Sequence, residues 1–163
     1  MGPQGGSRFL GREGTECMKN YDKLLFVSGS NTSVSPMAEA IMQEALRLED
    51  ILIESRGLVV LFPEPVNPKS EAILVSNGLT MKGHTSTPFS KDDFDERTLI
   101  LTMDQGQKEK LLNEYENSMN VYTLAEFVGW DSDVPDPYGG VMADYGHCFE
   151  QLKSMLALLT DKL

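Results

Sequence analysis

The sequence predicts a single three-layer α/β/α domain built around a four-stranded parallel sheet. Short apolar runs alternate along the chain with segments of helical periodicity, which is the pattern of right-handed βαβ units. The runs are continuously apolar rather than alternating, as in strands that helices cover on both faces. The length of 163 residues suits one domain with a full-sized core, and there is no internal repeat.

The predicted elements follow one another without a long unassigned stretch. The four expected strands are residues 24–27, 51–53, 98–103 and 120–123. Helices are expected at 37–48, from Asn67-Pro68 to about Val75, from Ser90 onward, at 105–115, and over a final apolar stripe that runs from Tyr145 to Leu159. Residues 58–67 and 131–140, which contain prolines, are expected to be loops. Ligands of such sheets bind where the strands end.

Composition excludes several classes of function. The formal net charge of −11 argues against nucleic acids and anionic membranes as partners, because both require a basic surface. Two cysteines and two histidines provide neither a disulfide framework nor a zinc site, so we expect no metal and no cofactor. No apolar signal segment or membrane span is apparent, which favours a cytoplasmic protein. The oligomeric state stays open.

The first 17 residues are rich in glycine and polar residues and lack periodicity. A second methionine, Met18, stands just before the first strand, so we interpret residues 1–17 as a vector-derived leader and 18–163 as the domain. Cys17 is then incidental. A native disordered tail is the alternative interpretation.

The segment between the first strand and the first helix predicts a binding site for an oxyanion. Its residues are small and polar, and Ser35 followed by Pro36 resembles a helix N-cap and a first helical residue. A loop of this kind turns backbone N–H groups into one space at the positive end of a helix dipole. The plainer alternative is an ordinary strand-to-helix turn. The loop, called the 28–35 loop below, consists of Ser28, Gly29, Ser30, Asn31, Thr32, Ser33, Val34 and Ser35.

This segment resembles the phosphate-binding loop of the low-molecular-weight protein tyrosine phosphatases, including their bacterial arginine-phosphatase branch. The family pattern is an apolar strand followed by Cys-x-Gly-Asn-x-Cys-Arg-Ser-Pro-x-Ala-Glu. The matching positions here are Asn31, Ser35, Pro36, Met37, Ala38 and Glu39. The departures fall on the reactive positions: Ser28 replaces the nucleophilic Cys, Ser33 the second Cys, Val34 the phosphate-clamping Arg, and Ser30 the Gly.

The resemblance continues to the C-terminus and implies a Rossmann-like, flavodoxin-like sheet. Asp136, in Asp-Pro-Tyr-Gly-Gly, matches the loop that carries the family's general acid, although this sequence is also a common turn. Ser55 and His84 match residues that, with Asn31 and Ser35, hold the phosphate loop in shape. The resemblance therefore gives His84 a supporting role rather than a chemical one.

Two further features resemble the arginine-phosphatase branch. Thr32 stands between the loop Asn and the second Cys position, and residues 122–127 also look like that branch. Whether phosphotyrosine or phosphoarginine was the ancestral substrate stays open.

The substitutions predict a family member without phosphatase turnover. A serine hydroxyl is far less acidic than a cradled thiol and needs an adjacent base, which the loop lacks. Losing a bidentate arginine clamp removes a preorganised donor worth about 2.7–4 kcal/mol. Arg56, beside Ser55, is a hypothetical replacement for the missing charge; the alternative is a solvated surface arginine.

The leading hypothesis is a pseudophosphatase whose loop binds phosphate, sulfate or a phosphorylated protein side chain. One alternative is an interaction module of the same fold that uses its acidic surface. Another is a working tyrosine or arginine phosphatase that uses Ser28, or a bound water, with Asp136. The related arsenate reductases require a Cys nucleophile and further redox cysteines, so their chemistry is excluded.

Overall fold

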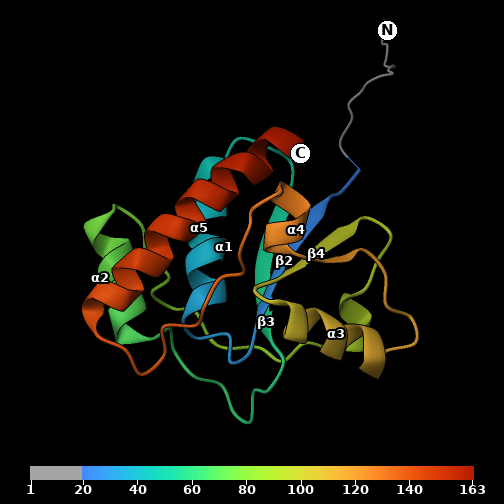
Figure 1. Cartoon of the computed structure of the whole chain (residues 1–163), viewed down its shortest axis with the longest axis horizontal. Helices are drawn as coiled ribbons and strands as arrows, with labels where there is room; N and C mark the ends of the chain where they lie inside the picture. Colours follow the sequence, from blue (N-terminus) through green and yellow to red (C-terminus); the bar gives the residue numbers. More distant parts are fainter. Residues whose placement is uncertain (1–19) are drawn as a thin grey trace, which may run out of the picture.

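The computed structural model describes residues 20–163, and the proposed leader lies outside them. Its sheet has four parallel strands in the order β3-β2-β4-β5. The strands are β2 (Lys23–Ser28), β3 (Leu52–Gly57), β4 (Thr98–Thr102) and β5 (Val121–Thr123). All four strands point the same way, so their carboxyl ends meet at one edge of the sheet (Figure 1). The predicted α/β fold class is confirmed.

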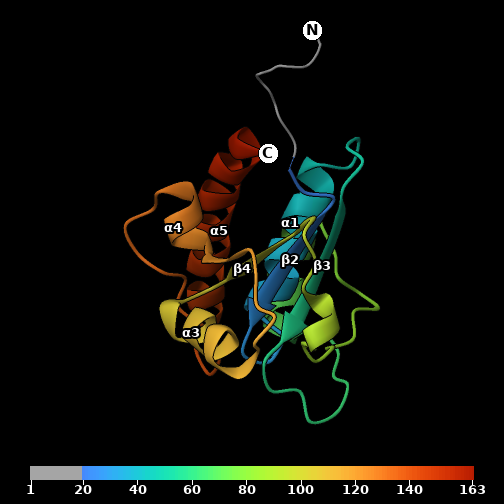
Figure 2. The ribbon, with the colours of Figure 1, turned by 90° about the vertical axis from the view of Figure 1, so that its right-hand side faces the viewer.

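Helices cover both faces of the sheet and complete three layers (Figures 1 and 2). One face carries α1 (Val34–Ala45), α2 (Pro68–Ser76), α4 (Leu124–Val128) and α5 (Met142–Lys162). The other face carries α3 (Gln105–Glu114) and a 3-10 turn, η1 (Lys91–Asp93). No helix in residues 20–163 is both long and apolar enough to cross a bilayer.

The central strand β2 is buried on both sides and divides the core in two. Leu24 and Phe26 pack with α1 and α5, whereas Leu25 and Val27 pack with Leu111 of α3 and with the aromatic residues near η1. This alternation fixes the faces of β3, because paired residues in a parallel sheet share a face. Phe26 pairs with Ser55 and Val27 with Arg56. Ser55 therefore faces α1, and Arg56 faces the opposite layer.

Apart from α1, two helical segments differ from the prediction. The helix expected from Ser90 is only the single turn η1, after which Phe94 adopts extended backbone and packs edge-on against Phe89 at a ring-centroid distance of 5.1 Å. Helix α4 was not predicted. It begins with a capping box between Thr123 and Glu126 and has only five residues, too few for a recognisable apolar period.

Candidate anion-binding site

The 28–35 loop joins β2 to α1 at the carboxyl edge of the sheet, and its carbonyl groups point outward. The outer partners are as follows: Leu58 N–H donates to Ser28 O (3.0 Å), Val59 N–H to Gly29 O (2.9 Å), the His84 ring to Asn31 O (2.8 Å), Asn67 N–H to Thr32 O (2.8 Å), and the Ser70 hydroxyl to Ser33 O (3.3 Å). These donors come from the segment just after β3, from the N-cap and first turn of α2, and from the segment before η1. Contacts distant in sequence thus hold the loop from outside.

The outward carbonyls place the N–H groups on the inside of the loop. In a trans peptide the C=O of one residue and the N–H of the next point in opposite directions. The N–H groups that follow the five bonded carbonyls therefore turn inward; they belong to Gly29, Ser30, Thr32, Ser33 and Val34. Within residues 20–163 none of these five has a protein acceptor. Convergent N–H groups at a helix N-terminus form an anion site.

The helix begins two residues earlier than the sequence predicts. Ser33, not Ser35, is the N-cap of α1, and Pro36 is its third residue rather than its first. Ser33 and Ser35 could each serve as a cap, and contacts within the loop decide between them. The Ser35 hydroxyl is fully buried and lies 2.6 Å from the Ser28 hydroxyl, so it is engaged inside the loop and not in capping.

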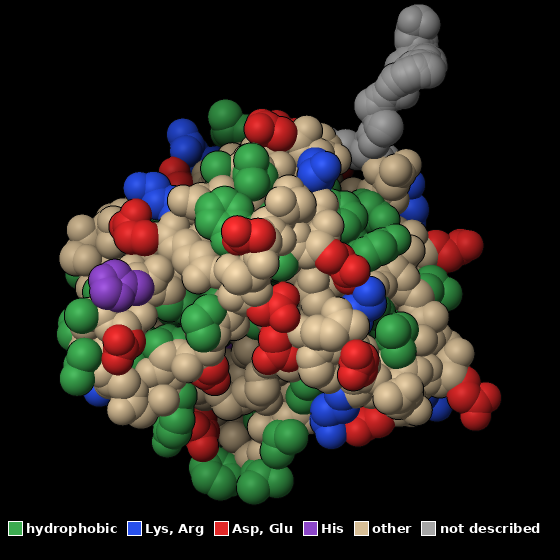
Figure 3. Space-filling model, in the orientation of Figure 1, with side chains coloured by type: hydrophobic (Ala, Val, Ile, Leu, Met, Phe, Trp, Pro, Cys, Tyr) green, Lys and Arg blue, Asp and Glu red, His purple; other side chains and the backbone are tan. Residues whose placement is uncertain are grey.

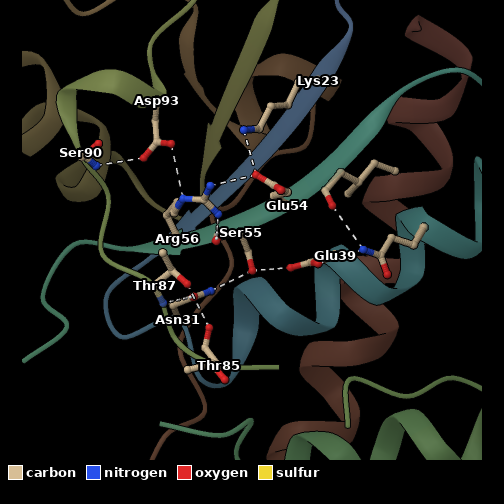
Figure 4. A network of polar contacts seen from close by, with 12 residues as sticks. Lys23, Asn31, Glu39, Glu54, Ser55, Arg56, Thr85, Thr87, Ser90 and Asp93 are labelled. Carbon is tan, nitrogen blue, oxygen red and sulfur yellow. Dashed lines mark hydrogen bonds and ion pairs between the residues drawn. The ribbon is translucent and has the colours of Figure 1, made fainter. Parts of the chain in front are cut away.

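Asn31 is the centre of the polar network beneath the loop (Figure 4). Its Nδ2 donates to the hydroxyls of Ser35 and Ser55, both at 2.9 Å, and its Oδ1 accepts from Thr87 N–H at 2.9 Å. The residue is fully buried and has φ of 62°, a left-handed conformation that asparagine tolerates better than most residues. The expected grouping of Asn31, Ser35, Ser55 and His84 around the loop is present.

Glu39 of α1 extends this network through Ser55. The Ser55 hydroxyl donates to Glu39 Oε1 at 2.5 Å. Burial raises the pKa of the Glu39 carboxyl, and the bond from Ser55 partly opposes that rise. Glu39 matches the family pattern in the sequence, but its contact with Ser55 was not predicted.

Gly57, at the end of β3, allows the loop to approach the sheet. A Cβ built at this position would lie 2.9 Å from the carbonyl carbon of Ser30 and 3.0 Å from Cβ of Asn31. Both are closer than side chains normally come, and the Ser30 atom belongs to the backbone. The loop therefore needs a residue without a side chain at this position.

Arg56 does not supply the missing positive charge, and the hypothesis of compensation is wrong. Its guanidinium lies 2.8 Å from Glu54 Oε1 and 3.4 Å from Asp93 Oδ1, and it also donates to its neighbouring carbonyl, Ser55 O (Figure 4). The strand alternation places the Arg56 side chain on the face away from α1. The solvated alternative is also incorrect, because the side chain is only 18% exposed.

Val34 lies in the hydrophobic core. It is 2% exposed and packs in the cluster formed by β2, α1 and α5. The position at which the family pattern carries an arginine thus serves apolar packing in this chain.

Asp136 lies on an exposed loop and lines a cavity that is separate from the 28–35 loop. Its Oδ1 accepts from Tyr138 N–H at 3.0 Å, and it lines a cavity of about 510 Å³ together with Asp144, His147 and Cys148. No residue of the 28–35 loop lines this cavity within the described chain. Burial, and secondarily the Asp136 charge, raises the pKa of the Cys148 thiol to about 12.

An apolar rim lies beside the site and was not predicted from the sequence. The loop between β3 and α2 projects past the carboxyl edge of the sheet, and apolar side chains gather there at the bottom of the space-filling view (Figures 1 and 3). Val59, Leu61 and Phe62 are 59%, 87% and 63% exposed. With Ser30 and Glu64 they line a shallow cavity of about 190 Å³. The sequence feature that could have predicted this rim is the presence of three large apolar residues in one short loop, where side chains are usually exposed.

Comparison with known proteins places this geometry in a family. A sequence profile described as low molecular weight phosphotyrosine protein phosphatase matches residues 23–163. The low molecular weight protein-tyrosine-phosphatase PtpB of Staphylococcus haemolyticus is 34% identical over 137 residues, which cover 84% of this chain and 96% of that protein. The protein-arginine-phosphatase of Geobacillus stearothermophilus is 28% identical over 143 residues, covering 86% and 95%.

Solved structures of phosphatases of this family have the same fold as this chain. The YwlE arginine phosphatase from Geobacillus stearothermophilus superposes with a TM-score of 0.80 at 28% identity, covering 86% of this chain and 91% of that chain. A cysteine-to-serine mutant of YwlE arginine phosphatase, described as having a phosphorylated active site serine, gives a TM-score of 0.75 at 28% identity, covering 86% and 95%. From the match over residues 23–163 and this shared fold, the chain belongs to the low molecular weight phosphotyrosine protein phosphatase family.

Proposed function

We propose that this family member binds a phosphoryl group in the 28–35 loop and does not hydrolyse it by the family's thiolate mechanism. The loop would take inorganic phosphate or sulfate, or a phosphorylated side chain of a protein. The observation that carries the proposal is the outward bonding of five loop carbonyls, which leaves five N–H groups facing the interior. Backbone donors do not depend on the lost side chains, so binding can outlast catalysis.

The absence of turnover follows from the groups around Ser28. Its hydroxyl contacts the Ser35 hydroxyl and Asn31 N–H, and neither group is a base that could take its proton. Cys148, the only cysteine in residues 20–163, has a pKa raised to about 12 and cannot serve as a thiolate. With Val34 in the core and Arg56 paired with carboxylates, the described residues place no arginine at the loop.

The solved relative with a phosphorylated active site serine bears on both binding and chemistry. It supports the view that a serine-bearing loop of this architecture accommodates a phosphoryl group. It also favours the first step of a second candidate function, attack by Ser28 on a phosphoryl group with Asp136 as the acid. The named relatives act on phosphotyrosine or phosphoarginine proteins, and these are the phosphoryl donors to test.

The proposal is tested by titrating ¹⁵N-labelled protein with inorganic phosphate, with chloride at matched ionic strength as the control. We expect phosphate alone to shift the amide signals of the inward-facing N–H groups, from Gly29 to Val34. Because no arginine clamps the ion, the dissociation constant should be on the order of millimolar. Shifts that chloride reproduces, or none in the loop, would contradict phosphate binding and favour the interaction-module alternative.

A further inference from the structure

Ser33 carries a buried hydroxyl without a partner. It is 2% exposed, and its Oγ is the one buried side-chain nitrogen or oxygen in residues 20–163 that has no hydrogen bond. An unsatisfied buried polar group destabilises a folded protein, and native structures contain few of them. The chain therefore keeps a costly hydroxyl at the first turn of the helix that faces the anion site.

The position of Ser33 makes this absence unusual. Ser33 is the N-cap of α1, where a serine hydroxyl ordinarily accepts a bond from an N–H of the first turn, but it makes no such bond. Its carbonyl is held from outside by Ser70, and the N–H groups of Ser33 and Val34 lie on the inner side of the loop. The hydroxyl and the neighbouring N–H groups are thus all unsatisfied in one place.

A second spare hydroxyl proton belongs to the pair Ser28 and Ser35. Thr87 N–H can only donate, so Asn31 Oδ1 accepts it and Asn31 Nδ2 must be the group that faces Ser35. Ser35 therefore accepts from Asn31, and the bond between the Ser28 and Ser35 hydroxyls uses one of their two protons. Ser28 also accepts from Asn31 N–H, so its oxygen is fully engaged as an acceptor when Ser35 donates to it. In that arrangement the proton of Ser28 is left without an acceptor; when Ser28 donates instead, the proton without an acceptor is that of Ser35.

We propose that the Ser28 and Ser33 hydroxyls donate to the bound oxyanion and form a charge-neutral, hydroxyl-lined site with the inward N–H groups. This inference rests on the proposed function and goes beyond it, because it assigns two side chains as ligand donors. In the family pattern these positions are cysteines, so the two serines add donors where the relatives have thiols. The ligand class is a tetrahedral oxyanion with several acceptor oxygens, such as phosphate, sulfate or a phosphoryl group.

The test separates a ligand donor from a structural residue. Wild type, Ser33→Ala and Ser76→Ala are compared in two measurements: the dissociation constant for inorganic phosphate, and the melting temperature without ligand. Ser76 bonds to Ile73 O at the far end of α2, so its variant controls for a serine-to-alanine change outside the site. We expect Ser33→Ala to weaken phosphate binding by about 10- to 100-fold, the value of a hydrogen bond to a charged group. We expect the same change to raise the melting temperature by a few degrees, since it removes an unsatisfied buried hydroxyl.

If Ser33→Ala raises the melting temperature and weakens phosphate binding, the Ser33 hydroxyl serves the ligand rather than the fold. If wild type binds phosphate and Ser33→Ala binds it equally well, the inference is wrong and the proposed function stands. If the melting temperature and the affinity fall together, Ser33 is structural and the inference again fails. If wild type binds neither phosphate nor sulfate, the proposed function itself fails.

Discussion

Asn31 offers the most demanding test of how the loop is held. Replacing it with alanine removes three side-chain hydrogen bonds, to Ser35, Ser55 and Thr87. At about 0.5–1.5 kcal/mol for each bond, the loss is about 1.5–4.5 kcal/mol. Alanine at φ of 62° adds about 1–2 kcal/mol of backbone strain. We therefore expect Asn31→Ala to lower the free energy of unfolding by about 2.5–6.5 kcal/mol, a large part of a typical total of about 5–15 kcal/mol.

Glycine at the same position separates the two contributions. Asn31→Gly loses the same bonds but not the strain, so it should be less destabilising than Asn31→Ala by about 1 kcal/mol. Asn120 is the matched control: its φ is 56°, but its amide bonds only to exposed carbonyls of Asp95 and Glu96. Its alanine and glycine variants should differ in the same direction with a smaller total loss. Urea unfolding followed by circular dichroism gives all four values. A loss below about 1 kcal/mol for Asn31→Ala would refute the assigned network.

Three further predictions concern residues around the loop. Gly57→Ala should push the loop off the sheet at Ser30 and abolish phosphate-induced amide shifts in the ¹⁵N titration while the protein stays folded; unchanged shifts would show that the close approach is not required. With its pKa raised to about 12, the Cys148 thiol should resist Ellman's reagent at pH 8 in a variant without other cysteines, and react fully once urea unfolds the protein; rapid native labelling would disprove its burial. The bond from Lys23 holds the pKa of the Glu54 carboxyl below its usual value, so its stabilising effect is present above the usual value and is lost as pH falls through the lowered pKa. The stability difference between wild type and Glu54→Gln should therefore be full near neutral pH and vanish in acid, and a difference independent of pH would contradict the assignment.

Much of the fold could be predicted from local sequence, because buried parallel strands and amphipathic helices leave strong patterns. Continuous apolar runs located β2 and β4, and the N-cap Asn67 located α2. Helix α4 escaped because five residues are too short for a helical period. The start of α1 was misplaced because Ser33 and Ser35 are equally good caps in isolation, and the bonds of Ser35 to Ser28 and Asn31 distinguish them.

The site was predictable in composition and less so in geometry. The direction of Arg56 could have been inferred, since its neighbour Ser55 faces Asn31 and adjacent strand residues face opposite ways. The outward partners of the loop could not, because Asn67, Ser70 and His84 lie 35 or more positions from the carbonyls that they hold. Such contacts depend on the tertiary fold.

The central claim, binding without turnover, is tested most directly by the hydrolysis of an aryl phosphate. The wild type is measured beside a Ser28→Cys, Val34→Arg double variant, which restores the nucleophile and the clamp of the family pattern. We predict no wild-type rate above that of buffer and measurable turnover by the double variant, in which the new arginine must leave the core position that Val34 occupies. Wild-type turnover that Asp136→Ala abolishes would contradict the claim and establish a serine- or water-based mechanism.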